Sequence, residues 1–295
     1  MSEYLLRSLM FVPGHNARLL ASAAHSDADA LLLDIEDSVQ PVDNKQVARD
    51  RILEFVGSQS PKRQLYFPRV NDRESGQLLK DIQQLTVPCI DGFMYPKSHK
   101  GEDVYFFDKL LETIEYEKEI PVGTFKIIPL IETAAAVLNA QEICRASGRV
   151  IAIAFGCEDF VADLGGVHDP EGTSLFVPRA LIAMAARANG VVPIDTVHVR
   201  VHDLEELERN LSVAKNLGYE GMLVLHPKEI PLAHRYFSPS ADEIQKAEEM
   251  LRLYERSVLE SRGVAVVDGR FVGPPMVALA KRVLRRAELL ARRQA

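Results

Sequence analysis

The sequence has few cysteines, no tryptophan and no long hydrophobic run. Its three cysteines, Cys89, Cys144 and Cys157, are too few and too scattered for a disulfide framework or a zinc cluster, and they are typical of a reducing cytosol. No apolar stretch reaches the roughly 18 residues that span a bilayer. The first residues also lack the basic segment and apolar core of a secretory signal. We therefore expect a cytoplasmic protein with no membrane partner.

Positive charge is also in short supply. The 295 residues include 35 Lys and Arg against 42 Asp and Glu, which gives a net charge of −7. Because affinity for nucleic acids comes mainly from neutralised phosphates, this balance argues against a nucleic-acid partner. The hydrophobic fraction of 47% and the charged fraction of 26% are ordinary for a globular protein, so disordered, collagen-like and coiled-coil classes are excluded.

What the sequence does contain is a series of short apolar runs, rich in β-branched or aromatic residues. Such runs are typical of strands buried on both faces of a parallel sheet. They cover residues 8–13, 30–36, 64–70, 92–97, 125–132, 150–156, 193–199 and 221–227. Segments with helical spacing lie between most of them, at 17–26, 44–57, 76–85, 105–119, 134–147, 178–189 and 204–217. The alternation predicts an α/β fold, a (β/α)₈ TIM barrel rather than an open doubly wound sheet.

The pattern changes after the eighth run. Residues 240–261 and 275–293 have helical spacing, and residues 263–275 between them resemble a loop. We therefore predict two domains. Residues 1–237 form the barrel that carries the catalytic site, and residues 238–295 form a C-terminal helical extension that contacts a neighbouring subunit.

Charged side chains end several of the predicted strands, where a barrel places its active site. Carboxylates with few histidines or cysteines favour a hard cation, so we expect Mg²⁺, with Mn²⁺ as the alternative. Glu132 and Asp159 end adjacent strands and are the best pair of metal ligands. For either acid alone, a helix N-cap or a structural ion pair is an equally valid interpretation.

Arg69 ends the third strand and can bind a carboxylate with two parallel hydrogen bonds. It is therefore a candidate for both substrate binding and catalysis. The alternative is a buried structural pair with Glu36 or Asp37, which end the second strand and are themselves catalytic candidates. Both interpretations hold together if Glu36 orients the arginine that holds the substrate.

Seven motifs in this order resemble the citrate lyase β-subunit-like family of the HpcH/HpaI aldolase superfamily. They are RSLMFVPG at 7–14, LDIEDSV at 33–39, PRVN at 68–71, PKS at 96–98, IPLIET at 128–133, FGCEDF at 155–160 and HPK at 226–228. The family includes malyl-CoA, citramalyl-CoA and citryl-CoA lyases, and the resemblance extends to about residue 285.

The resemblance implies a Mg²⁺-dependent carbon–carbon lyase that cleaves or forms a 3-hydroxyacyl-CoA. It implies a barrel that is usually trimeric, with Mg²⁺ on Glu132 and Asp159 and with Glu132 also close to the substrate. It implies that Arg69 binds the carboxylate of an α-keto acid, and that Arg7 and Lys97 lie along the acyl-CoA path. Whether the chain works with an acyl carrier protein cannot be read from these motifs.

The sequence departs from the family at two positions. Gly273 stands where many members have an aspartate that acts as acid or base in a neighbouring subunit, and Glu229 stands where many have glutamine. The missing aspartate keeps a second hypothesis open, an aldolase that acts on a free hydroxy-keto acid without CoA. A third, from another class, is a non-catalytic metabolite-binding protein.

Overall fold

The computed structural model describes residues 3–169, 171–259, 265–267 and 270–294. The chain divides into two compact units, which are described separately. One consists of Leu6–His234, and the other combines Met1–Leu5 with Arg235–Ala295.

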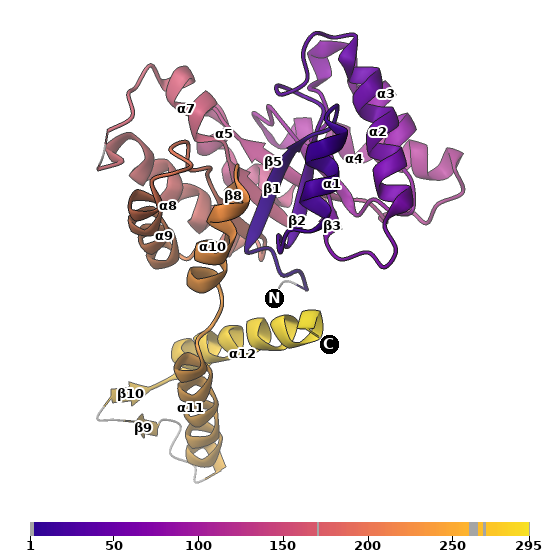
Figure 1. Ribbon diagram of the computed structural model, residues 1–295. Coiled ribbons are helices and arrows are strands. Elements are labelled where there is room, and N and C mark those ends of the chain that lie inside the picture. Colours follow the sequence, from indigo (N-terminus) through magenta and orange to yellow (C-terminus); the bar gives the residue numbers. More distant parts are fainter. Residues whose placement is uncertain (1–2, 170, 260–264, 268–269, 295) are drawn as a thin grey trace. The chain divides into compact units, whose positions relative to one another are not determined.

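The first unit is built on eight parallel strands (Figure 1). They are β1 (Ser8–Pro13), β2 (Ala30–Asp34), β3 (Leu65–Tyr66), β4 (Gly92–Tyr95), β5 (Lys126–Ile131), β6 (Ala152–Phe155), β7 (Val192–Asp195) and β8 (Gly221–Val224). The order β3-β2-β1-β8-β7-β6-β5-β4 pairs the first strand with the last. Isolated parallel bridges from Arg69 to Asp34 and to Met94 join the two outer strands. This ring confirms the predicted TIM barrel.

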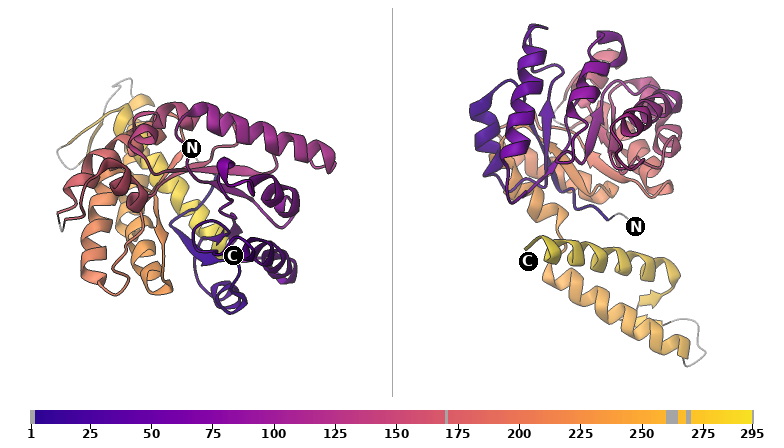
Figure 2. Two further views of the ribbon diagram at one scale, coloured as in Figure 1. Left: turned by 90° about the horizontal axis from the view of Figure 1, so that it is seen from above. Right: turned by 90° about the vertical axis from the view of Figure 1, so that its right-hand side faces the viewer.

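Helices surround the ring, as the views along and across it show (Figure 2). They are α1 (Ala17–Ala24), α2 (Asn44–Ser58), α3 (Leu78–Leu85), α4 (Gly101–Glu117), α5 (Ala134–Leu138), α6 (Ala140–Arg145), α7 (Cys157–Leu164), α8 (Thr173–Ala188), α9 (Leu204–Leu217) and α10 (Ile230–Phe237), which continues past His234 into the second unit. Two 3₁₀ turns, η1 (Arg73–Ser75) and η2 (Pro227–Glu229), follow the β3 and β8 regions.

Local sequence explains why these elements start and stop where they do. Every residue of β2 is buried, as its continuous apolar sequence requires. Helix α9 begins at Asp203, whose side chain accepts a hydrogen bond from the Glu206 N–H, and it ends at Gly218 in the left-handed conformation. Beside β4, the Tyr95 and Phe107 rings stack with centroids 4.3 Å apart. Packing of this kind fixes the strand ends that carry the functional side chains.

Several element boundaries differ from the prediction. The predicted helix 134–147 is two helices, because the backbone breaks at Asn139. Helices α7 and α10 were not predicted at all, and β7 ends at Asp195 rather than at Val199. Arg179 binds the Asp195 carboxylate with two hydrogen bonds at 3.0 and 2.5 Å, and the chain leaves the sheet at that point.

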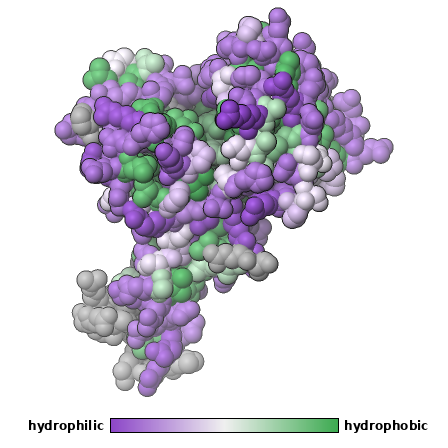
Figure 3. Space-filling view, viewed as in Figure 1, coloured by the Kyte–Doolittle hydropathy of each residue, from purple (hydrophilic) through white to green (hydrophobic). Residues whose placement is uncertain are grey.

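The second unit contains α11 (Ala241–Leu259), β9 (Ala265–Val267), β10 (Arg270–Val272) and α12 (Pro274–Gln294). The prediction of a loop at 263–275 is wrong in part, because β9 and β10 pair as an antiparallel ribbon. No helix among the described residues is long and apolar enough to cross a membrane. Hydrophilic side chains cover most of the face of the barrel unit seen in Figure 3, with smaller hydrophobic areas between them.

Candidate active site

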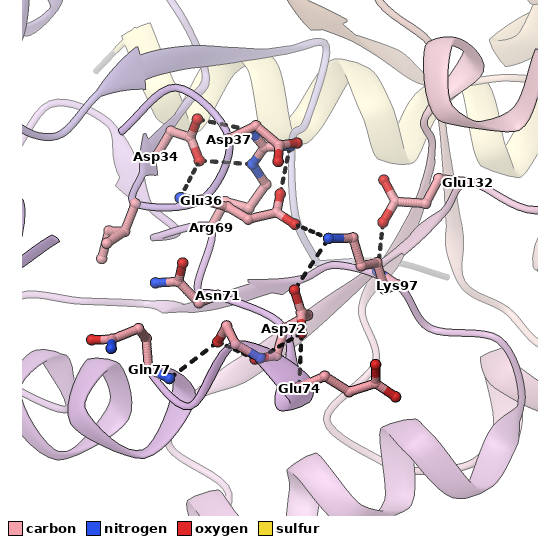
Figure 4. Close-up of polar contacts among 12 residues, drawn as sticks. Asp34, Glu36, Asp37, Arg69, Asn71, Asp72, Glu74, Gln77, Lys97 and Glu132 are labelled. Carbon is pink, nitrogen blue, oxygen red and sulfur yellow. Dashed lines mark hydrogen bonds and ion pairs between the residues drawn. The ribbon is translucent and has the colours of Figure 1, made fainter. Parts of the chain in front are cut away.

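A cavity of about 470 Å³ opens where the barrel strands end at their C-terminal side. Five of its lining residues are acids and one is a cation, Arg69; the acids are Asp34, Asp37, Glu132, Glu158 and Asp159. The structure therefore brings together the predicted metal ligands, the predicted carboxylate-binding arginine and one of its predicted partners. Figure 4 shows Asp34, Asp37, Arg69 and Glu132 of this set, together with Glu36 and Lys97.

Arg69 is held by three carboxylates at once. Its Nε and Nη2 atoms donate to the two Asp34 oxygens, each at 2.7 Å. Its Nη1 atom lies 3.0 Å from Glu36 Oε2 and 3.4 Å from Asp37 Oδ2. The guanidinium also stacks over the Phe11 ring, 4.9 Å from its centroid. The structure is thus compatible with both roles predicted for Arg69, an ion pair with buried acids and substrate binding, because the paired arginine still faces the cavity.

Glu36 is a buried carboxylate that lies between two cations. Its Oε2 faces Arg69, and its Oε1 lies 3.2 Å from Lys97 Nζ. Both oxygens are within ion-pair distance, yet neither has a hydrogen bond of good geometry. Burial raises the pKa of Glu36 to about 7, against the opposing effect of Arg69. The negative charge of Glu36 is therefore stabilised by two nearby cations but by no well-formed hydrogen bond.

Lys97 contacts Glu36 and Asp72 through its ammonium and Glu132 through its backbone N–H. Its ammonium bridges Glu36 and Asp72, with Nζ 3.1 Å from Asp72 Oδ2 (Figure 4). Its backbone N–H donates to Glu132 Oε1 at 2.5 Å. The backbone has φ +50°, the left-handed region that side chains rarely adopt. A strained backbone thus directs this N–H towards Glu132.

Glu132 ends β5 and is only 2% exposed. Burial raises its pKa to about 8, and the neighbouring charges of Glu36 and Asp159 add to the increase. Gly156 lies against it, since a Cβ at position 156 would come within 3.0 Å of the Glu132 Cβ. Asp159 is exposed in the first turn of α7 and lines the same cavity. Two acids from adjacent strand ends therefore face one space, one of them buried at a high electrostatic cost.

Arg7 is not part of this cluster. It precedes β1 and therefore lies at the opposite, N-terminal end of the barrel, where it is 6% exposed. Its Nε and Nη2 atoms bind the two Asp29 oxygens at 2.9 and 2.8 Å. The structure does not bring Arg7 together with the other predicted residues, because a buried ion pair fixes it at the far end of the strand.

Two residues of the site were missed in the sequence. Asp34 is the main partner of Arg69, although the motif LDIED pointed to its neighbours Glu36 and Asp37 instead. Arg69 overcomes the effect of burial and holds the pKa of Asp34 below its ordinary value. The available signal was the strand period of two, which places Asp34 and Glu36 on the same side. Asp72, which anchors Lys97, had no comparable signal in the sequence.

The chain belongs to the HpcH/HpaI aldolase/citrate lyase family, which it matches over residues 7–227. The citrate lyase subunit beta of Leuconostoc mesenteroides subsp. cremoris is 31% identical over 286 residues, 97% of this chain and 94% of that protein. A (3S)-malyl-CoA thioesterase of Cereibacter sphaeroides is 29% identical over 285 residues, 97% of this chain and 95% of that protein. The family and its assignment as a lyase are as predicted.

Solved structures agree with this assignment. The CitE protein of Mycobacterium tuberculosis, in complex with magnesium, acetoacetate and coenzyme A, superposes with a TM-score of 0.75. It is 26% identical, and the match covers 95% of this chain and 97% of that one. The same protein in complex with magnesium and pyruvate matches with a TM-score of 0.66, over 84% of this chain and all of that one.

Proposed function

We propose that this protein is a Mg²⁺-dependent carbon–carbon lyase that cleaves, or in reverse forms, a 3-hydroxyacyl-CoA such as malyl-CoA, citramalyl-CoA or citryl-CoA. The observation that carries the proposal is one cavity in which a buried carboxylate, Glu132, faces a second acid, Asp159, beside a single arginine, Arg69. The malyl-CoA-related and CoA-bound relatives support the choice of substrate class.

The donor set fits Mg²⁺. Two carboxylates are the usual protein contribution to a magnesium site, and waters and substrate oxygens complete the coordination. Both candidate ligands are carboxylates, hard oxygen donors that suit Mg²⁺ better than the nitrogen and sulfur donors typical of zinc sites. Burial and the charges of Glu36 and Asp159 raise the pKa of Glu132, and a divalent cation bound there would favour its charged form.

The other residues have distinct parts in the proposal. Arg69 holds the carboxylate of the keto-acid half, and Glu36 keeps the guanidinium in place. Asp37 lines the cavity, and its side chain is 60% exposed and held only by a 3.4 Å contact to Arg69. Asp37 is therefore the acid around Arg69 that is most accessible to a bound substrate. Lys97 positions Glu132 through its backbone N–H and Glu36 through its ammonium. Its side chain is 46% exposed and two acids contact the ammonium, so the third N–H donor can reach the acyl-CoA.

The reaction follows from these parts. When bound, Mg²⁺ supplies Lewis-acid polarisation of the substrate oxygen beside the carboxylate. The substrate hydroxyl gives its proton to Asp37, and its oxygen becomes the carbonyl of the keto acid as the carbon–carbon bond breaks. The electron pair of that bond forms the enolate of the acyl thioester. The enolate carbon takes up a proton from water and Asp37 returns its proton to the solvent, so no proton is gained or lost overall. Arg69 keeps the keto acid oriented, which makes the reverse condensation effectively unimolecular.

Purified protein with Mg²⁺ tests the proposal against a panel of CoA thioesters and free hydroxy-keto acids. We expect release of glyoxylate, pyruvate or oxaloacetate from a CoA thioester, with loss of activity in Glu132→Gln. Release of free CoA without any keto acid would instead indicate thioester hydrolysis and would contradict a lyase. Turnover of free hydroxy-keto acids alone would replace the CoA substrate.

One observation favours a second candidate, an aldolase for free hydroxy-keto acids. Gly273 immediately precedes α12, and its carbonyl accepts hydrogen bonds from the Met276 and Val277 N–H groups. Glycine has no side chain to donate a proton to an enolate, and a positioned acid is typically worth about 10²–10⁴-fold. The substrate panel separates the two candidates.

We further propose that the protein is a homotrimer in the cytoplasm, with residues 238–295 contacting a neighbouring subunit. The support is the family resemblance together with three cysteines that remain free. Light scattering coupled to gel filtration, on the full chain and on a form that lacks residues 238–295, tests both the trimer and the role of the extension.

A further inference from the structure

Charge is distributed unevenly around the active-site cavity. Among the described residues that line it, Arg69 is the one cation, and five acids surround the same space. Arg69 already uses Nε and one Nη2 hydrogen on Asp34, and Nη1 faces Glu36 and Asp37. The guanidinium can therefore take up one more carboxylate and no second one.

The nearest other cations do not supply a second site. The Lys97 ammonium lies outside the lining of the cavity and is shared by Glu36 and Asp72. Arg200 follows the lining residue Val199 and lines an adjoining cavity of about 150 Å³, which shares Val197 and Val199 with this one. Its Nη1 lies 3.2 Å from Glu206, so its charge is already paired with an acid.

The remaining lining of the cavity includes an apolar wall. It is formed by Phe11, Leu130, Val197, Val199, Leu223 and Leu225. Val199 and Leu225 are 50% and 41% exposed, and both line this cavity, so a bound molecule can cover part of their apolar surface.

We propose that this cavity selects α-keto acids with a single carboxylate and a hydrogen or a small apolar group on the other side of the keto carbon. The inference rests on the proposed function and narrows its substrate class. Glyoxylate, pyruvate and 2-oxobutyrate have this form, whereas oxaloacetate carries a second carboxylate. The acyl-CoA substrate is then of the malyl-CoA or citramalyl-CoA kind rather than citryl-CoA.

The physical reason is the cost of a second, unpaired charge. With Arg69 and the metal ligands engaged by the first carboxylate, a second one would lie against the apolar wall or beside Asp37 and Glu158. Removing an ionised carboxylate from water without a partner is strongly unfavourable, and the like charges of the acids add repulsion. A methyl group in the same place would cover Val199 and Leu225 and gain from apolar contact.

A matched pair of ligands tests this directly. 2-Oxobutyrate and oxaloacetate both have four carbons and differ in a terminal methyl against a carboxylate. We would titrate each, freshly dissolved, into the wild-type protein by calorimetry at saturating Mg²⁺. We expect oxaloacetate to bind at least about tenfold more weakly, a difference of about 1.4 kcal/mol. Equal or tighter binding of oxaloacetate would overturn the inference and leave the lyase proposal intact. If neither keto acid bound, both proposals would fail.

A gain-of-function variant gives a second test. Leu225→Arg places a cation on the apolar wall, whereas Leu225→Met keeps the wall apolar at similar volume. We expect Leu225→Arg to shift the ratio of oxaloacetate to 2-oxobutyrate affinity at least about tenfold towards oxaloacetate, since a buried charge pair is recovered. Leu225→Met should leave the ratio within about twofold of wild type. A ratio that moved equally in both variants would argue against charge as the basis of selection.

Discussion

Glu229 offers a quantitative test of how this fold holds a buried acid. The side chain is fully buried in η2, directly after β8. Its Oε2 accepts hydrogen bonds from the Leu225 and His226 N–H groups at 2.9 and 3.2 Å, and its Oε1 is buried without a hydrogen-bond partner. Burial raises its pKa from 4.5 to about 7, against the effect of the two N–H donors. The charged form is therefore disfavoured in the folded state.

The sign of the effect on stability follows from proton linkage. Between pH 4.5 and 7 the folded protein keeps a proton on Glu229 that the unfolded chain has already lost, so the free energy of unfolding falls as pH rises. The loss due to this group is about 3 kcal/mol at pH 8 and less than about 1 kcal/mol at pH 5. An amide does not titrate in this range, so the Glu229→Gln variant should lack this loss.

Urea denaturation of both proteins at pH 5 and pH 8 checks the prediction. We expect the free energy of unfolding of Glu229→Gln, relative to wild type, to increase by about 2 to 3 kcal/mol between the two pH values. The change in the difference is the informative quantity, because any constant cost of the amide cancels, as does the titration of all other acids. A relative stability that stayed the same at both pH values would refute an elevated pKa at Glu229.

Three further predictions concern the cavity. Glu132→Gln and Asp159→Asn should each weaken Mn²⁺ binding at least about tenfold, as measured by electron paramagnetic resonance. Glu158→Gln changes an acid on the same wall and should retain wild-type Mn²⁺ binding. Arg69→Lys should lose nearly as much pyruvate affinity as Arg69→Ala, because one ammonium cannot span the two Asp34 oxygens and a ligand; calorimetry with wild-type affinity in Arg69→Lys would contradict this. Lys97→Gly should be more stable than Lys97→Ala by about 1 kcal/mol in urea, since glycine adopts the left-handed backbone without strain, and equal stabilities would exclude strain there.

The number and order of the strands could be predicted because buried parallel strands leave a clear pattern. A run such as the one in β2 has no polar residue until its C-terminal end, so its identity as a strand and the direction of its functional end follow together. The end of β7 could not be predicted in this way. Val197 and Val199 continue the apolar pattern beyond Asp195, but they line the cavity instead of the sheet. Apolar residues that line a cavity and apolar residues of a buried strand are of the same types, so the sequence pattern does not separate them.

Part of the candidate site was predictable as a set of residues, but its network of contacts was not. Glu132, Asp159 and Arg69 were found because strand ends of a barrel converge, which depends on topology alone. The partners of each side chain depend on distances of a few tenths of an ångström and on backbone angles. The left-handed conformation of Lys97 is an example, since lysine rarely adopts it and nothing in the PKS motif indicates it.

The junction between the β3 and β4 regions affects how this protein would lose ligand binding. Between the β3 and β4 regions the ring is joined by few backbone hydrogen bonds, including those from Met94 N–H to Pro68 O and from Val70 N–H to Met94 O. Pro68 has no N–H to contribute. Arg69, between them, carries the guanidinium that faces the cavity. Arg69 is bonded to β2 through its backbone and through Asp34, so a local opening between the β3 and β4 regions would leave it on the β2 side and move it away from Glu132. Ligand recognition would therefore be lost before the rest of the fold.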